Sequence, residues 1–217
     1  MTKKRFIVMT SICIVLLLIS IFYTFKQYQE NQQYERFIST KLSQSLSEYV
    51  TAILANDETL NQFISSGKKE ILSEQATNLC YNFKTISMEY DEMLSIAIKL
   101  KKVNDSQTNH ITANLSQDIH FFLGRSVIGN GLLGDCSQVE SNISLDEMQL
   151  EKLKEIQKIN KQWSEIAIKY VPEATSTGVT NVDWNFVVND KMWIKLLEEF
   201  SVYANKSGMI GINQFFN

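Results

Sequence analysis

The chain has 217 residues, a formal net charge of −3, and one proline against eight glycines. So small a net charge predicts neither a basic face for DNA or RNA nor a strongly acidic surface. Nucleic-acid binding is therefore excluded from the expected functions. With a single proline, long stretches lack a helix breaker, and the composition favours an all-α fold over a turn-rich β fold.

The first apolar run, Phe6 to Phe25, contains no charged side chain and follows the basic residues Lys3, Lys4 and Arg5. A helix of this run is about 30 Å long at 1.5 Å per residue, which matches the hydrocarbon thickness of a bilayer. The run is longer than the core of a typical signal peptide, and bulky side chains stand where a signal peptidase needs small ones. We therefore expect an uncleaved membrane anchor, with a cleaved signal peptide as the alternative.

The orientation of the anchor follows from the basic residues that flank it. The three basic residues before the run outweigh Lys26 and Arg36 after it, and the more basic flank is retained in the cytoplasm. We expect residues 1–5 to be cytoplasmic, 6–25 to form the transmembrane anchor, and 26–217 to form one extracytoplasmic helical domain. The protein is thus predicted to lie in the cell membrane with its amino terminus inside and its carboxyl-terminal domain outside.

Residues 26–54 contain neither glycine nor proline, and the pattern predicts an amphipathic helix that continues the anchor outward. Its apolar side chains recur every three or four residues: Ile38, Leu42, Leu46, Tyr49 and Ile53. Asn56 or Asp57 is predicted to cap a second, short helix that ends at Gly67.

The next stretch carries the clearest periodicity in the chain, two apolar series of seven-residue spacing offset by four residues. The series are Leu72, Leu79, Ile86, Met93 and Leu100, and Ala76, Phe83, Tyr90 and Ala97. This heptad stripe predicts a helix packed nearly parallel or antiparallel to its neighbours. We expect the stripe to face the core of the domain itself, and a homodimeric coiled coil through the stripe is the alternative.

Three further helices are expected after this one. Residues 108–123 place Ile111, Leu115, Ile119 and Phe122 on one face, and a glycine-rich loop with Gly124, Gly129, Gly131 and Gly134 follows. A capping box of Ser144 and Glu147 predicts a helix to Tyr170, with Met148, Ile156, Trp163 and Tyr170 inward. After a loop over residues 171–181, the last helix is predicted over 182–204, with Gly208 as its stop and an inward side formed by Phe186, Trp193, Leu197, Phe200 and Ala204.

The expected fold is therefore all-α, a single transmembrane helix followed by an extracytoplasmic helical bundle of four or five helices. Cys13 lies within the anchor, which leaves Cys80 and Cys136 as a pair in an oxidising compartment. We predict a disulfide between them, closing a loop that is worth about 4 kcal/mol on the chain-entropy model. Two unpaired, buried thiols are the alternative.

No constellation of residues predicts catalysis, a cofactor or a metal site. The sequence GNGLLG matches the glycine pattern of dinucleotide-binding folds, but a helix is expected before it where that motif needs a strand. His110 and His120 are ten residues apart, which turns them roughly 80° from each other on a helix, so they form a poor metal pair. Neither has a glutamate three residues before it, as dinuclear sites in helical bundles require. We expect a protein that is not an enzyme and carries no cofactor.

Two functions of different class fit these expectations, and the composition, rich in Lys, Asn and Ile, suggests a bacterial source. The first is a non-enzymatic interaction module of the bacterial cell envelope that binds another envelope protein or an exported protein. The second is a small-molecule-binding or sensory bundle, with its ligand between helices near Trp163, Trp184 or Trp193. Because only residues 1–5 are expected inside the cell, a sensor would need a membrane partner to carry its output.

Overall fold

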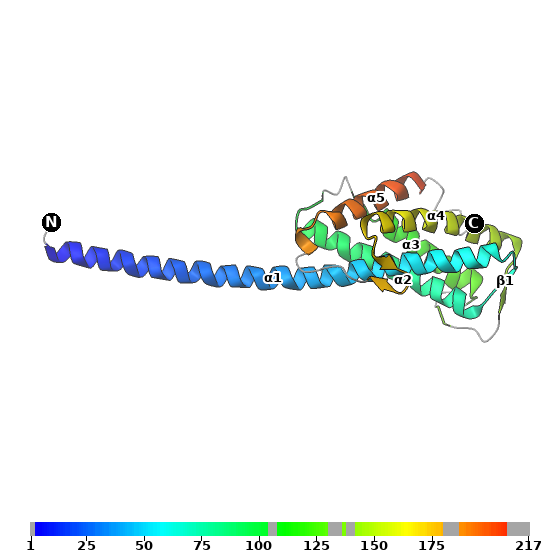
Figure 1. The fold of residues 1–217 in the computed structure, drawn as a ribbon, viewed down its shortest axis with the longest axis horizontal. Coiled ribbons are helices and arrows are strands. Elements are labelled where there is room, and N and C mark those ends of the chain that lie inside the picture. The colour runs from blue at the N-terminus through cyan, green and yellow to red at the C-terminus, as the bar shows by residue number, and fades with distance from the viewer. Residues whose placement is uncertain (1–2, 104–107, 130–135, 138–141, 180–186, 208–217) are drawn as a thin grey trace.

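The computed structural model describes residues 3–103, 108–129, 136–137, 142–179 and 187–207, with side chains from Ser11 onward. The described chain is mostly helical (Figure 1). Its α-helices are α1 (Lys3–Ser65), α2 (Ser73–Lys99), α3 (Ile111–Phe122), α4 (Glu147–Tyr170) and α5 (Met192–Ser207). Shorter elements connect them: β1 (Glu70–Ile71), the π-helix η1 (Leu123–Val127), β2 (Ile143–Ser144), β3 (Ala174–Thr175), β4 (Gly178–Val179) and the 3₁₀ helix η2 (Val187–Asn189).

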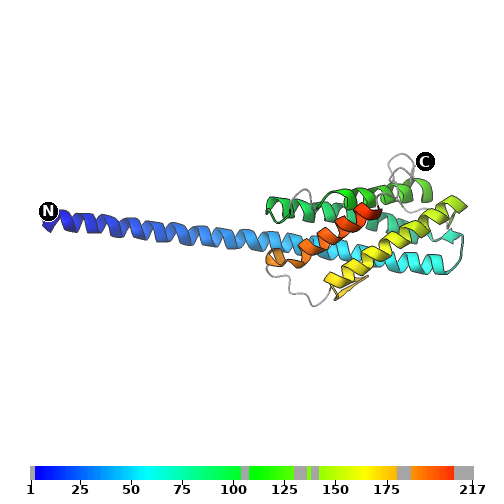
Figure 2. The same cartoon turned by 90° about the horizontal axis from the view of Figure 1, so that it is seen from above.

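Helix α1 has two parts with different surroundings. Almost every side chain from Ser11 to Phe37 is exposed, and the helix projects alone from the rest of the protein (Figures 1 and 2). This part is long and apolar enough to cross a membrane. From Ser39 onward the same helix enters the helical domain, and we call residues 26–37, which lie between the predicted span and the domain, the stalk.

The domain has one apolar core, to which every α-helix contributes. The second part of α1 packs against α2 and α4, while α3 packs against α2, and α5 against α4 and α3. Large rings fill the centre, with the Phe200 ring 5.1 Å from the Tyr49 ring and 6.0 Å from the Trp163 ring, measured between centroids. Because α1 supplies part of this core, the exposed apolar segment and the folded domain share one continuous backbone helix.

The heptad stripe of α2 faces this core. Leu79, Ile86 and Met93 are fully buried, and so is the second series, Ala76, Phe83, Tyr90 and Ala97. At the ends of the stripe the burial is lost, since Leu72 is 51% exposed and Leu100 is half-buried. A coiled coil between two copies of the chain would need the same side chains that are already buried within one copy.

The predicted break of the first helix at Asn56 or Asp57 is wrong, because α1 runs without interruption to Ser65. The buried Asn56 side chain does not cap a new helix; its Oδ1 accepts a hydrogen bond from Asn82 Nδ2 of α2 at 3.0 Å. The side-chain oxygen that could cap a helix is thus bonded to a neighbouring helix, while the Asn56 Nδ2 is buried with no partner among the described residues. The helix ends close to the predicted stop, since Gly67 has a left-handed φ of +64°.

The predicted capping box of Ser144 and Glu147 is also wrong. The cap of α4 is Asp146, whose Oδ1 accepts from the backbone N–H of Gln149 at 2.7 Å, while Gln149 Oε1 accepts from the Asp146 N–H at 2.8 Å. Ser144 lies in β2 instead, opposite Glu70 in the antiparallel pair of β1 and β2. Of the side chains predicted inward, Ile156 and Trp163 are buried and Tyr170 is half-buried, whereas Met148 in the first turn is 63% exposed.

The last helix begins later than predicted. Residues 180–186, with Trp184 and Phe186, lie outside the described part, and α5 starts at Met192 after the short η2. The Asp190 carboxylate accepts from the Met192 N–H at 2.8 Å, which places a helix-initiating turn there. Within α5 the predicted inward side holds, since Trp193, Leu197, Phe200 and Ala204 are fully buried, while the predicted stop Gly208 is outside the described residues. The loop expected before it carries the hairpin of β3 and β4.

Candidate functional site

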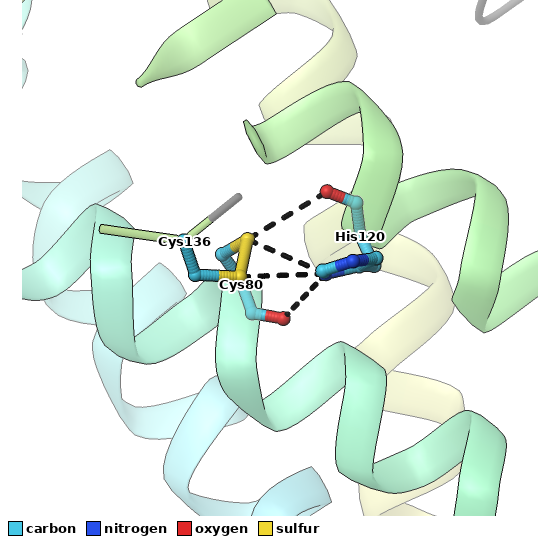
Figure 3. The surroundings of a disulfide bond; sticks show 3 residues. All are labelled: Cys80, His120 and Cys136. Carbon is cyan, nitrogen blue, oxygen red and sulfur yellow. Dashed lines mark hydrogen bonds between the residues drawn. A yellow bond between two sulfur atoms is a disulfide. The ribbon is translucent and has the colours of Figure 1, made fainter. Parts of the chain in front are cut away.

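Three chemically reactive side chains meet in the interior of the domain, Cys80 of α2, His120 of α3, and Cys136 from the segment between η1 and β2 (Figure 3). All three are buried. Cys80 follows Leu79 of the heptad stripe and lies on the buried face of α2. His120 lies on the buried face of α3, beside Ile119 and Phe122. Three segments distant in the sequence are thus joined at one point.

The two sulfur atoms are joined in a disulfide, with an S–S distance of 2.09 Å and a Cα–Cα distance of 5.7 Å. The His120 ring lies against this bond, its Nδ1 atom 3.4 Å from the Cys80 sulfur and 3.5 Å from the Cys136 sulfur. The same Nδ1 lies 3.1 Å from the Cys80 carbonyl oxygen. The disulfide therefore links α2 to the segment after η1, and the imidazole links the bond to α3.

The protonation of His120 follows from these contacts. A carbonyl oxygen only accepts hydrogen bonds, so Nδ1 carries the proton and donates it to Cys80. Burial lowers the pKa of His120, the hydrogen bond to the Cys80 backbone opposes this shift, and the positive charge of Lys84 adds to it. The ring is neutral at pH 7, with its Nδ1 proton directed to the Cys80 carbonyl.

Two cysteines and one histidine are also a donor set for soft metal ions, and the three donor atoms lie within 4.8 Å of one another. In the disulfide form the sulfur atoms have no thiolate charge to give, and the Nδ1 lone pair is replaced by the donated proton. The residues therefore fit a covalent cross-link with a supporting histidine, and a metal ion would require the bond to be reduced first.

The sequence paired Cys80 with Cys136, but it did not place His120 beside them. Forty residues separate Cys80 from His120, and only the packing of α3 on α2 brings them together. The two histidines do not meet, since exposed His110 pairs through Nδ1 with Asp91 Oδ1 at 2.7 Å. Spacing along one helix was the only signal available for the histidines, and it carries no information about contacts between helices.

A surface cleft of about 350 Å³ lies between α4 and α5, and we call it the α4–α5 cleft. Lys169 Nζ donates to both carboxylate oxygens of Glu199, at 2.7 and 2.9 Å, and the Tyr170 hydroxyl donates to Glu199 at 2.6 Å. These two donors lower the pKa of Glu199, and the shared carboxylate raises the pKa of Tyr170. Val202, half exposed, adds an apolar wall beside this polar group.

A second cleft of about 270 Å³ lies where the stalk enters the domain, and we call it the stalk cleft. Its lining joins α1 to the end of α2 and to η2: Asn31, Tyr34, Glu35, Ile38, Leu100, Lys102, Val188 and Asn189. The end of the domain that faces the apolar part of α1 therefore has its own surface, distinct from the α4–α5 cleft.

The tryptophans named for ligand binding do not line either cleft. Trp163 and Trp193 are fully buried, and their indole N–H groups have no hydrogen-bond partner among the described residues. Trp184 lies outside the described part. Of the glycine motif, Gly129 has a left-handed φ of +81° after η1, and Gly131 and Gly134 are likewise outside the described residues.

No protein family model matches the chain, and no curated protein and no solved structure matches it either. The surfaces, charges and packing described above are therefore the basis for a function, because a fold alone does not determine one.

Proposed function

We propose that the chain is a single-pass membrane protein that holds a helical bundle outside the cytoplasm to bind another envelope or exported protein, without catalysing a reaction. The observation that carries the proposal is the continuity of α1, which is exposed and apolar at one end and part of the domain core at the other. Its amino terminus is cytoplasmic in this proposal, in keeping with the basic residues before the apolar run.

A continuous helix gives the protein a property that a flexible linker would not. The stalk has no glycine or proline, and its 12 residues extend about 18 Å at 1.5 Å per residue. The bundle is therefore held at a set height above the membrane, with a set orientation. A fixed height and orientation favour contact with a partner that is itself bound to the envelope.

The disulfide supports the extracytoplasmic placement of the bundle. Disulfides persist in oxidising compartments and are rare where cytosolic reductants act. A cross-link between Cys80 and Cys136 is therefore expected outside the cytoplasm. It agrees with the orientation deduced from the charges at the amino terminus, and the two arguments are independent of each other.

The α4–α5 cleft is the face that we assign to the partner. It combines the exposed apolar side chain of Val202 with Tyr203 and a charged pair, the mixture found in interfaces between proteins that also exist separately. The heptad stripe is buried within the chain, so a homodimer would also have to use another face. A small-molecule site near Trp163 or Trp193 would need space that the packed rings do not leave.

The experiment is photo-crosslinking in intact bacterial cells, with the full chain carrying a crosslinking amino acid at Val202. The matched control carries it at Leu72, which is equally exposed but lies at the far end of the domain. We expect a discrete crosslinked species from position 202 and not from position 72. A folded chain that gives no discrete species from either position overturns the proposal. An epitope tag at the carboxyl terminus, accessible before lysis, tests the orientation separately.

A further inference from the structure

Lysines gather at the end of the domain from which the stalk emerges. The last residue of α2 is Lys99, and Lys101 and Lys102 lie directly after the helix. Lys191 lies just before α5. All four side chains are exposed, and none takes part in an ion pair described for this structure. Figure 1 shows the end of α2 and the start of α5 at the side of the domain that faces the projecting part of α1. We call these four residues the membrane-proximal lysines.

The stalk cleft sets their height above the predicted span. Lys102 lines this cleft together with Asn31 and Glu35 of α1, and the Val188 N–H donates to the Ser39 hydroxyl at 3.4 Å. Residues 31–35 lie about 9 to 15 Å beyond Phe25 along the helix. The headgroup region adds roughly 5 to 8 Å to each side of the hydrocarbon, and the Debye length at physiological salt is about 8 Å. The lysines therefore stand within electrostatic reach of the headgroups.

Few acidic groups oppose them. Among the described residues at this end, Asp91 pairs with His110, Glu92 with Lys41, and Glu30 of the stalk with Lys26, which leaves the carboxylates of Glu35, Glu89 and Asp190. Arg36 of the stalk adds a further exposed positive charge. The opposite end of the domain is mixed in charge, with Lys69 paired to Glu147 at 3.8 Å. A chain of net charge −3 thus presents an excess of positive charge toward its own predicted membrane.

Lys101 occupies a backbone position that favours glycine. Its φ is +53°, and the backbone N–H groups of Lys101 and Lys102 donate to the carbonyls of Ile98 and Ala97, both at 2.9 Å. This is the left-handed end of an α-helix, where a side chain costs free energy and glycine does not. A lysine at this position adds a charge to the membrane-proximal end at the expense of local backbone energy, and backbone strain of this kind is concentrated at functional sites.

We propose that the membrane-proximal lysines bind the anionic phospholipid headgroups of the membrane in which α1 is anchored. The inference rests on the proposed function, because it requires α1 to span that membrane. Lipid binding at this end fixes the tilt of the bundle as well as its height. The start of the stalk supports it, since Tyr28 is an exposed ring about 4.5 Å beyond Phe25, where aromatic side chains favour the headgroup region.

Hydrogen exchange on the full chain in lipid nanodiscs tests the proposal. One sample contains phosphatidylcholine only, and the other contains about a third phosphatidylglycerol. Each lysine near an anionic surface contributes about a fivefold factor to binding, so we expect amides 99–103 and 187–191 to exchange at least fivefold more slowly with the anionic lipid. High salt should remove the difference, because it screens charges that lie in water.

Two sets of variants make the result specific. The triple change K99Q, K101Q and K102Q should abolish the lipid-dependent slowing at amides 99–103, whereas the matched triple K68Q, K69Q and K158Q, of equal charge and exposed elsewhere, should retain it. The single change K101G keeps the backbone turn and should weaken the effect. Equal slowing in both triple variants overturns the inference, as does equal exchange in the two lipids or slowing produced by inorganic phosphate with the neutral lipid. A chain that fails to remain in the nanodisc contradicts the membrane anchor itself.

Discussion

Opening the disulfide should remove a large part of the stability of the domain. Cys80 and Cys136 are 56 residues apart, and a cross-link that closes a loop of this length is worth about 4 kcal/mol in the chain-entropy model. Domains of ordinary size are stable by only about 5 to 15 kcal/mol, so the loss is a substantial fraction of the total. The chain-entropy model attributes the lost stability to greater freedom of the unfolded chain, so the helical content of the folded protein should stay the same on reduction.

The assay is urea unfolding of the full chain in nanodiscs, followed by the fluorescence of the buried indoles of Trp163 and Trp193. The free energy of unfolding is compared between the oxidised protein, the reduced protein, and the double variant Cys80→Ala with Cys136→Ala. We expect a loss of about 4 kcal/mol on reduction and no effect of the reductant on the double variant. The double variant controls for other actions of the reductant.

A loss below about 1 kcal/mol on reduction would refute the entropic reasoning, because the loop-length model leaves no room for so small a value at this separation. Intact-mass measurement tests whether the disulfide is present. Protein purified without reductant should show a two-hydrogen deficit that disappears on reduction, and a protein without the deficit carries two thiols, the alternative named from the sequence.

Three further outcomes follow from the structure. Burial lowers the pKa of His120, so as the pH falls the unfolded chain takes up a proton before the folded protein does. The free energy of unfolding, measured with urea, should therefore fall as the pH drops below about 6.5. The dependence of this free energy on pH should be weaker in His120→Gln. Ile86→Ala should cost about 2 to 5 kcal/mol in the same assay, whereas Leu72→Ala, in the same heptad series but 51% exposed, should cost less than about 0.5 kcal/mol. Lys101→Gly should raise the melting temperature by relieving the left-handed φ, a gain of up to about 1 kcal/mol.

Periodic apolar spacing predicted the helices well where one face of a helix lies on the core. The stripe of α2 and the inward side of α5 were both predicted correctly, because a helix face on the core needs an apolar residue at every third or fourth position. The length of α1 was not predicted correctly. Asn56 is a good capping residue in isolation, and only the partner amide of Asn82, on another helix, explains why it sits inside α1.

The starts of helices were predicted less well for a related reason. Ser144 and Asp146 are both acceptable caps, and the choice between them is made by the pairing of β1 with β2, which places Ser144 opposite Glu70. That pairing joins segments more than seventy residues apart and has no local signal. The contact of His120 with the disulfide was beyond sequence reasoning in the same way, since it depends on how α3 packs on α2.

The polar contacts that the sequence could not show also determine how the exposed apolar segment and the domain move together. Buried amides fix the register of α1 against its neighbours, since Asn56 bonds to Asn82 of α2 and Asn160 of α4 donates to the Ile53 carbonyl at 2.9 Å. A buried amide without its partner costs about 1 to 3 kcal/mol, so α1 cannot slide or rotate within the core without breaking both bonds. Rotation or tilt of the apolar segment is therefore transmitted to the whole domain. The same rigidity is what would allow a few lysines at the membrane-proximal end to set the orientation of the α4–α5 cleft.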